Sequence, residues 1–134
     1  MTRATWKLVV AALLGTAVAC GGGGGTGPVA GLLKIKLATT PNAGLDGAIL
    51  LTVTAPVTPT GAAAQTGFRL FGTPTGTTST YAVTGTLAAG SILFTIDVPD
   101  INKVGQYSAT IQQVAASSNF ALRSLTSYAL SVTK

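Results

Sequence analysis

Apolar and polar residues alternate along most of the chain after residue 30. Between Gly31 and Ala38 three aliphatic residues alternate with two lysines, and four apolar residues alternate with other types between Ser91 and Val98. A period of two indicates a β-strand with one buried face. The same reasoning predicts seven strands, at residues 31–38, 48–54, 66–71, 79–85, 91–98, 106–114 and 126–133. No stretch has the spacing of a long amphipathic helix.

The predicted strands are short and are separated by turn-forming residues. Pro41-Asn42, Asp46-Gly47 and Pro99-Asp100 mark turns, and Pro56 and Pro59 predict a loop over residues 55–65. Seven short strands with such turns between them predict a single antiparallel, immunoglobulin-like β-sandwich. Its core should contain the apolar side chains Ile92, Phe94, Ile96, Val98, Tyr107, Ala109, Ile111 and Leu130.

One short motif supports this class of fold. The stretch Val104-Gly105-Gln106-Tyr107-Ser108-Ala109 resembles the start of the sixth strand of immunoglobulin-like domains. The resemblance implies that Tyr107 is the corner tyrosine whose hydroxyl bonds to upstream backbone. Ala109 stands where antibody domains carry their second cysteine, so antibody-type membership is excluded. A cohesin-like jelly roll is the alternative sandwich.

The first 25 residues carry a different pattern. Arg3 and Lys7 precede an uncharged apolar run over residues 8–19, which is too short to span a bilayer and is typical of a secretory signal peptide. The run ends in Ala17-Val18-Ala19-Cys20, which resembles the lipobox of bacterial lipoproteins. Leucine is usual in the family at Ala17, and a smaller residue at Val18, whereas Ala19 and Cys20 match.

That resemblance implies lipid modification of Cys20, the only cysteine of the chain. Cys20 would carry a diacylglycerol on its sulfur. A signal peptidase would cut the chain directly before Cys20, and the new amine of Cys20 would be acylated, for example with palmitate. The alternative is a free thiol after ordinary signal cleavage. Two or three acyl chains would anchor the protein stably.

The expected organisation is therefore a signal peptide at residues 1–19, a lipidated cysteine and glycine-rich tether at 20–30, and a β-sandwich domain at 31–134. The tether would reach roughly 17 Å. We expect an exported protein in the cell envelope. Gly21 stands where some inner-membrane lipoproteins carry aspartate, which favours the outer membrane if there is one.

Charge gives little indication of a charged partner. The chain has eight basic and three acidic residues, and six basic residues remain without Arg3 and Lys7. These six are scattered, whereas nucleic-acid-binding proteins group theirs on one face. We therefore expect no nucleic-acid partner.

The residue types also argue against catalysis. The chain has no histidine and no glutamate, and its only acids are Asp46, Asp97 and Asp100. Histidine-activated nucleophiles and histidine metal sites are excluded, and we expect no enzyme activity, cofactor or metal. Asp97, Asp100 and Asn102 could offer oxygens to calcium, but three such residues are also typical of a strand end and turn.

Aromatic residues are the remaining candidates for ligand contact. Phe68, Phe71 and Tyr81 lie in predicted strands and should pack in the domain. Phe120 lies in an irregular stretch with Arg123 nearby, and these two are the candidate ligand-contacting residues. The expected function is a non-catalytic binding or structural module, with an unknown protein or glycan partner. The alternative is a carbohydrate-binding module on the same lipid anchor.

The predicted strand order also predicts which loops lie near the membrane. If seven strands alternate in direction, loops 55–65, 86–90 and 115–125 return to the tethered end. Loops 39–47, 72–78 and 99–105 would then point away, together with Lys134. In this arrangement Phe120 and Arg123 would lie near the lipid headgroups.

Overall fold

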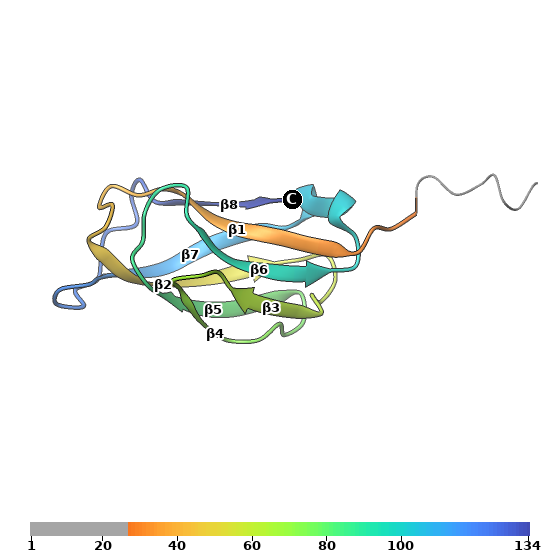
Figure 1. Cartoon of the computed structure of the whole chain (residues 1–134), viewed down its shortest axis with the longest axis horizontal. Coiled ribbons are helices and arrows are strands. Elements are labelled where there is room, and N and C mark those ends of the chain that lie inside the picture. Colours follow the sequence, from red (N-terminus) through yellow and green to blue (C-terminus); the bar gives the residue numbers. More distant parts are fainter. Residues whose placement is uncertain (1–26) are drawn as a thin grey trace, which may run out of the picture.

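The computed structural model describes residues 27–134, which form two antiparallel four-stranded sheets packed face to face (Figure 1). Cys20 and the predicted signal peptide lie outside the described residues. The elements in chain order are β1 (Gly31–Thr39), β2 (Asp46–Thr54), β3 (Gly61–Ala64), β4 (Arg69–Phe71), β5 (Thr78–Thr84), β6 (Ile92–Val98), the 3₁₀ helix η1 (Ile101–Gln106), β7 (Ser108–Ala116) and β8 (Ala129–Thr133). The prediction of a single antiparallel β-sandwich is confirmed.

The strand order is β3-β6-β1-β8 in one sheet and β4-β5-β2-β7 in the other. Consecutive strands β1 and β2 therefore lie in opposite sheets, whereas the first two strands of an immunoglobulin constant-type domain are neighbours in one sheet. Eight strands in two sheets is the strand number of a double-sheet jelly roll, the class to which the cohesin-like alternative belongs.

The core lies between the sheets and follows the alternation in the sequence. In β1 the three aliphatic side chains are fully buried, and Lys34 and Lys36 face the other way. The rings of Tyr81 from β5 and Phe94 from β6 meet across the core at 4.9 Å between centroids. The other fully buried large side chains are Leu33, Ile35, Leu37, Ile49, Leu51, Leu87, Leu93, Ile96, Val53 and Val83.

The predicted core differs in several details. Ala109, Ile111 and Leu130 are only partly buried and pack against the core from its edge. A register shift between Ile35 and Lys36 places Leu93 inside, and Ile92 is only half-buried. Phe71, expected to pack, is 55% exposed, because it lies on the edge strand β4 opposite Ala82 of β5, on the outer face of the sheet.

The predicted loop at 55–65 and strand at 66–71 are replaced by two strands. β3 is the small-residue sequence Gly-Ala-Ala-Ala and pairs with β6 at the edge of one sheet, while β4 pairs with β5 in the other sheet. Pro56 and Pro59 precede β3 and do not interrupt it. The chain therefore changes direction once more than the sequence analysis predicted.

This additional reversal makes the predicted loop positions wrong for most loops. Loops 40–45, 65–68, 85–91 and 117–128 lie at the end opposite Gly27, and we call them the distal loops (Figure 1). Loops 55–60 and 72–77 and helix η1 lie at the Gly27 end, where β8 also ends. Phe120 and Arg123 are therefore at the distal end rather than near the tether.

Candidate functional site

The distal loops support one another through backbone hydrogen bonds. The amide of Gly44 donates to the carbonyl of Leu87 at 2.9 Å, and the amide of Ser117 donates to the carbonyl of Leu45 at 2.9 Å. These bonds join the loops before β2, after β5 and after β7. The distal end is thus one connected surface made of segments far apart in the sequence.

Asp46 is the polar centre of this end. It begins β2, it is 0% exposed, and Arg123 Nε donates to its Oδ1 at 2.8 Å. The hydroxyl of Tyr128 donates to Oδ2, and Asn42 Nδ2 donates to that hydroxyl at 2.9 Å. Both carboxylate oxygens are therefore bound, as a buried charge requires. Burial and the hydrogen bond to Asp46 raise the pKa of Tyr128.

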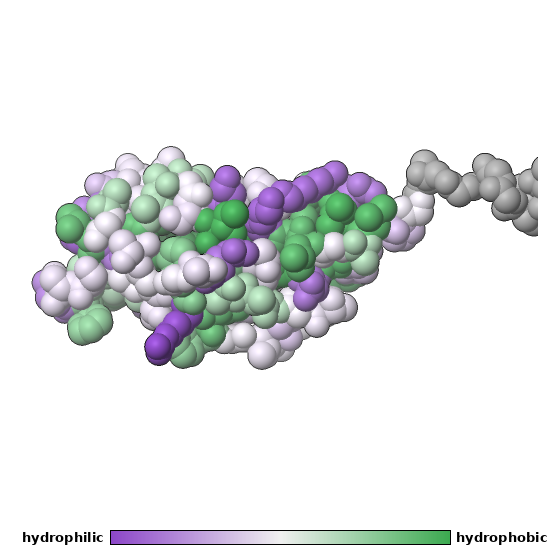
Figure 2. All heavy atoms as spheres, viewed as in Figure 1, coloured by the Kyte–Doolittle hydropathy of each residue, from purple (hydrophilic) through white to green (hydrophobic). Residues whose placement is uncertain are grey.

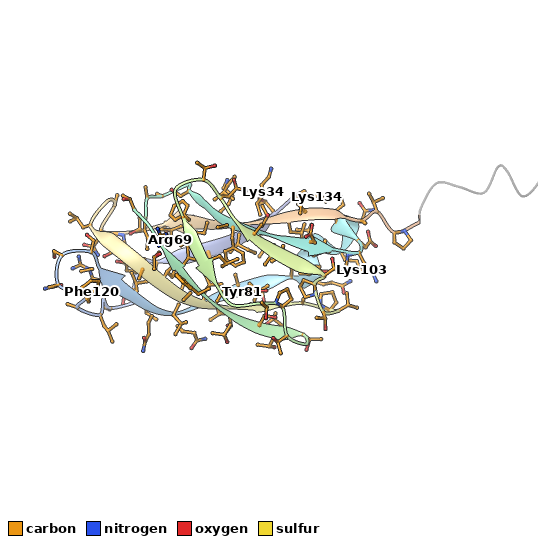
Figure 3. The ribbon with its side chains drawn as sticks, turned by 60° about the horizontal axis from the view of Figure 1, so that its bottom comes forward. Lys34, Arg69, Tyr81, Lys103, Phe120 and Lys134 are labelled. Carbon is orange, nitrogen blue, oxygen red and sulfur yellow. The ribbon has the colours of Figure 1, made fainter. Side chains whose placement is uncertain are left out.

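The β7–β8 loop carries Phe120, the most exposed phenylalanine among residues 27–134. Its first part is a tight reversal in which the Phe120 amide donates to the Ala116 carbonyl at 3.1 Å, and the Ala116 amide donates to the Ala121 carbonyl at 2.9 Å. Phe120 is 78% exposed and has φ of +57°. A positive φ is rare for a bulky residue and marks a genuine outlier. Figure 3 shows Phe120 at the distal tip of the domain.

A pocket of about 410 Å³ lies beside this loop and is called the distal pocket. Its walls consist of glycine backbone, three hydroxyl side chains, Asp46, Ala48 and Phe120. The lining residues are Gly44, Asp46, Gly47, Ala48, Gly67, Thr84, Gly85, Thr86, Ser117 and Phe120. Two of the glycines are required by close packing: a Cβ at Gly47 would come within 3.0 Å of Ser117 Cβ, and a Cβ at Gly85 within 2.6 Å of Phe68 Cδ1.

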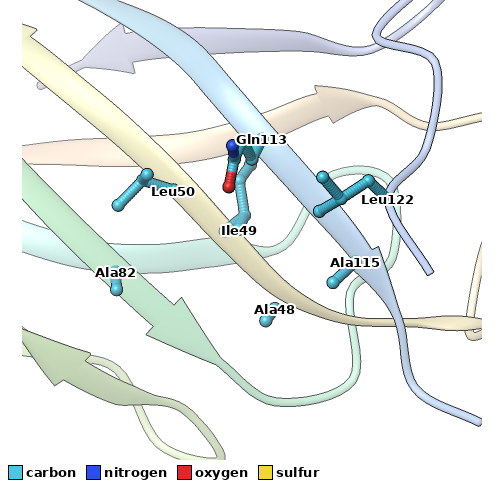
Figure 4. A pocket seen from close by; sticks show the side chains of 7 residues that line it. All are labelled: Ala48, Ile49, Leu50, Ala82, Gln113, Ala115 and Leu122. Atoms are coloured by element: carbon cyan, nitrogen blue, oxygen red, sulfur yellow. The ribbon is translucent and has the colours of Figure 1, made fainter. Parts of the chain in front are cut away.

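A smaller hollow lies on the outer face of the β5-β2-β7 sheet (Figure 4). It has a volume of about 110 Å³ and is floored by Ala48, Ala82 and Ala115, with Leu122 beside it. Ligand pockets usually have volumes of about 300–1,000 Å³. The distal pocket, and not this hollow, therefore has the size of a ligand site.

The structure separates the two candidate ligand-contacting residues. Phe120 is exposed and lines the distal pocket, whereas Arg123 is engaged by Asp46 and is 31% exposed. Arg123 therefore positions the loop, and Phe120 is the side chain available to a ligand.

The other candidate residues lie at the opposite end. Asp100 accepts from the Asn102 amide at 3.0 Å and from the Val29 amide at 3.3 Å, so it caps η1. Tyr107 is buried after η1, and its amide donates to the Val104 carbonyl at 3.1 Å. Within residues 27–134 no group of three His, Cys, Asp or Glu side chains could hold a metal.

Residues 27–134 thus form an all-β sandwich domain with a pocket between its distal loops. Compared with known proteins, no family model, curated protein or solved structure is significantly similar to it. In the described part of the chain no helix is long and apolar enough to cross a membrane. Figure 2 shows strongly hydrophilic side chains separated by weakly polar and apolar ones over the visible face.

Asp46, Asn42 and Tyr128 were not identified from the sequence. Asp46 is 77 residues from Arg123 and 82 residues from Tyr128 along the chain. No local pattern connects them, because their contact depends on β1 and β8 pairing and on the path of the β7–β8 loop. The sequence offered one signal for this site. Asp46 is one of only three acidic residues and begins a strand with a buried face, and a buried carboxylate needs a hydrogen-bonding partner.

Proposed function

We propose that this chain is a lipid-anchored, exported, non-catalytic binding module. An acylated Cys20 would hold the protein at a membrane of the cell envelope, and the distal loops would meet the partner. The domain would therefore present its ligand away from the lipid surface.

The relation between the two ends of the sandwich carries this proposal. The chain enters β1 at the Gly27 end, and the distal loops lie at the other end of the strands (Figure 1). The strands β1 and β2 have nine residues each, and a strand rises about 3.3 Å per residue. The distal loops are thus roughly 30 Å beyond the point where the chain enters the domain.

The chemistry of the distal end supports binding rather than catalysis. The Asp46 carboxylate is completely buried and held by Arg123 and Tyr128, so it is not available as a general base. The remaining lining residues are two threonines, a serine, four glycines, an alanine and a phenylalanine. Such groups recognise a ligand but do not move its protons at neutral pH.

The anchor is tested by mass spectrometry of the native protein from envelope membranes. The expected mature chain begins at Cys20 and carries a diacylglycerol and an amide-linked acyl chain, and the Cys20→Ser variant should be unprocessed and unlipidated. A mature chain that starts elsewhere with an unmodified Cys20 would show that the anchoring proposal is wrong.

Orientation is tested with spin labels on the anchored protein in lipid bilayers. Ser118 lies in a distal loop and Thr75 in the 72–77 loop at the Gly27 end, and both are exposed. Depth measurements should place the label at Thr75 nearer the lipid than the label at Ser118. The opposite order would contradict the distal presentation of the loops. A photo-crosslinker at Ser118, with Thr75 as control, would then capture a protein partner if one exists.

A further inference from the structure

We propose that the distal pocket binds a neutral sugar residue of a glycan, with Phe120 stacked on one face of the sugar ring. This inference names the ligand of the proposed binding module, and it rests on the distal end being the binding end. Four properties of the pocket support it: an apolar platform, hydroxyl groups, no free charge on the lining side chains, and open space above glycine backbone.

Phe120 supplies the apolar platform. Its side chain is 78% exposed although the backbone there adopts φ of +57°, a conformation that glycine or asparagine would accept more easily. Unfavourable backbone geometry of this kind concentrates at ligand-binding positions. The loop that holds Phe120 is fixed from below, because Arg123 and Tyr128 both bind the buried Asp46 carboxylate.

Hydroxyl groups form the polar side of the pocket. Thr84, Thr86 and Ser117 line it, and Ser117 Oγ donates to the Leu45 carbonyl at 3.0 Å, which leaves its lone pairs for a ligand donor. Among the described residues, the side chains of Thr84 and Thr86 have no protein hydrogen-bond partner. A hydroxyl both donates and accepts, and it therefore matches the hydroxyls of a sugar.

No charged side chain that lines the pocket is free to pair with a ligand; Arg69, the cross-strand partner of Thr84, is not among the lining residues. Asp46 is its only charged lining residue, and that side chain is 0% exposed with both oxygens bound. A charged ligand would lose hydration here without gaining an ionic partner. An uncharged ligand with one apolar face and many hydroxyls fits this set of groups.

Glycines keep the floor of the pocket open. At Gly44 and Gly67 no heavy atom lies within 4 Å of the position that a Cβ would occupy. Space is therefore left for a ring to approach the backbone, and the volume of about 410 Å³ can hold one or two sugar units.

The test is a titration of the purified full chain, kept in detergent, with cello-, xylo-, manno- and N-acetylchito-oligosaccharides, followed by calorimetry and amide chemical shifts. At least one of these neutral glycans should bind saturably and shift the amides of Gly67 and Gly85. The Phe120→Ala variant should bind about tenfold more weakly or worse, as expected for loss of an aromatic anchor, and Phe120→Trp should retain binding. Acidic oligogalacturonate should bind more weakly than the neutral glycans.

The matched control is Phe71→Ala, which removes the other strongly exposed phenylalanine, outside the pocket. It should leave glycan binding unchanged. Thr84→Val keeps the shape of the side chain and removes its hydroxyl, so it should also weaken binding.

Four results would overturn the sugar assignment: no binding of any neutral glycan, binding unaffected by Phe120→Ala, a loss caused by Phe71→Ala instead, or equal binding of the acidic glycan. Failure of this assignment differs from failure of the proposed function. A protein captured through Ser118 without glycan binding would leave the module proposal standing. An unmodified Cys20 with Phe120-dependent glycan binding would refute only the anchor.

Discussion

Removing Arg123 should destabilise the domain more than neutralising its partner Asp46. The Asp46 carboxylate is 0% exposed, and in the Arg123→Ala variant it loses the one cation that binds it among the described residues. Arg123, by contrast, is already 31% exposed in the wild-type protein, so water can solvate its charge in the Asp46→Asn variant. The two substitutions in this ion pair should therefore lower the free energy of unfolding by different amounts.

The magnitudes follow from burial. Breaking a buried pair so that one charge remains unpaired costs about 3–5 kcal/mol, and we expect this loss for Arg123→Ala. Asp46→Asn keeps an oxygen that accepts from Arg123, so it should cost about 1–2 kcal/mol. Both losses are large relative to the roughly 5–15 kcal/mol of a whole domain.

The double variant gives the sharpest measurement. Adding Asp46→Asn to Arg123→Ala removes the unpaired buried charge, so the double variant should be more stable than Arg123→Ala alone. Guanidinium chloride unfolding, followed by far-UV circular dichroism at neutral pH, measures all four proteins of the cycle. If Asp46→Asn costs more than Arg123→Ala, or if the double variant is the least stable, the burial argument is wrong.

Three further predictions concern the core and its tyrosines. Phe94→Ala, at a fully buried ring that packs on Tyr81, should cost about 3–5 kcal/mol in chemical unfolding, and a loss below about 1 kcal/mol would contradict its place in the core. Tyr81→Phe should be neutral or stabilising by up to about 1 kcal/mol, because the buried Tyr81 hydroxyl has no hydrogen-bond partner among the described residues; a clear loss of stability would reveal a partner. Burial raises the pKa of Tyr81, Tyr107 and Tyr128 above the ordinary 10.0, so the unfolded chain releases these protons first and stability should fall as pH rises above about 10. Urea unfolding at several alkaline pH values should show this fall, and it should be smaller in the variant with all three tyrosines changed to phenylalanine.

The strands with regular alternation were predictable from the sequence. β1 and β6 were predicted within one residue at each end, because apolar residues recur at every second position in both sequences. β3 was not, since four small residues after two prolines have no hydrophobic pattern. Its pairing with β6 depends on the space left beside that strand in the assembled sheet.

That one missing strand had a large effect on the predicted site. An extra strand reverses the direction of every element after it, and so Phe120 was assigned to the wrong end of the domain. Its exposure could be anticipated from the irregular sequence around it. The role of Arg123 could not, because the contact with Asp46 joins residues 77 positions apart.

The positions of the tether and of the distal pocket also determine how the domain would carry a mechanical load. A pull on a ligand at Phe120, resisted at Gly27, acts along the strands, so that the hydrogen bonds between neighbouring strands are sheared together. A pull between Gly27 and Lys134 is different, because β1 and β8 are paired antiparallel and both end points lie at one end (Figure 1). Those hydrogen bonds run perpendicular to the strands and would open one after another. The sandwich should therefore withstand traction on its distal end far better than separation of its two termini.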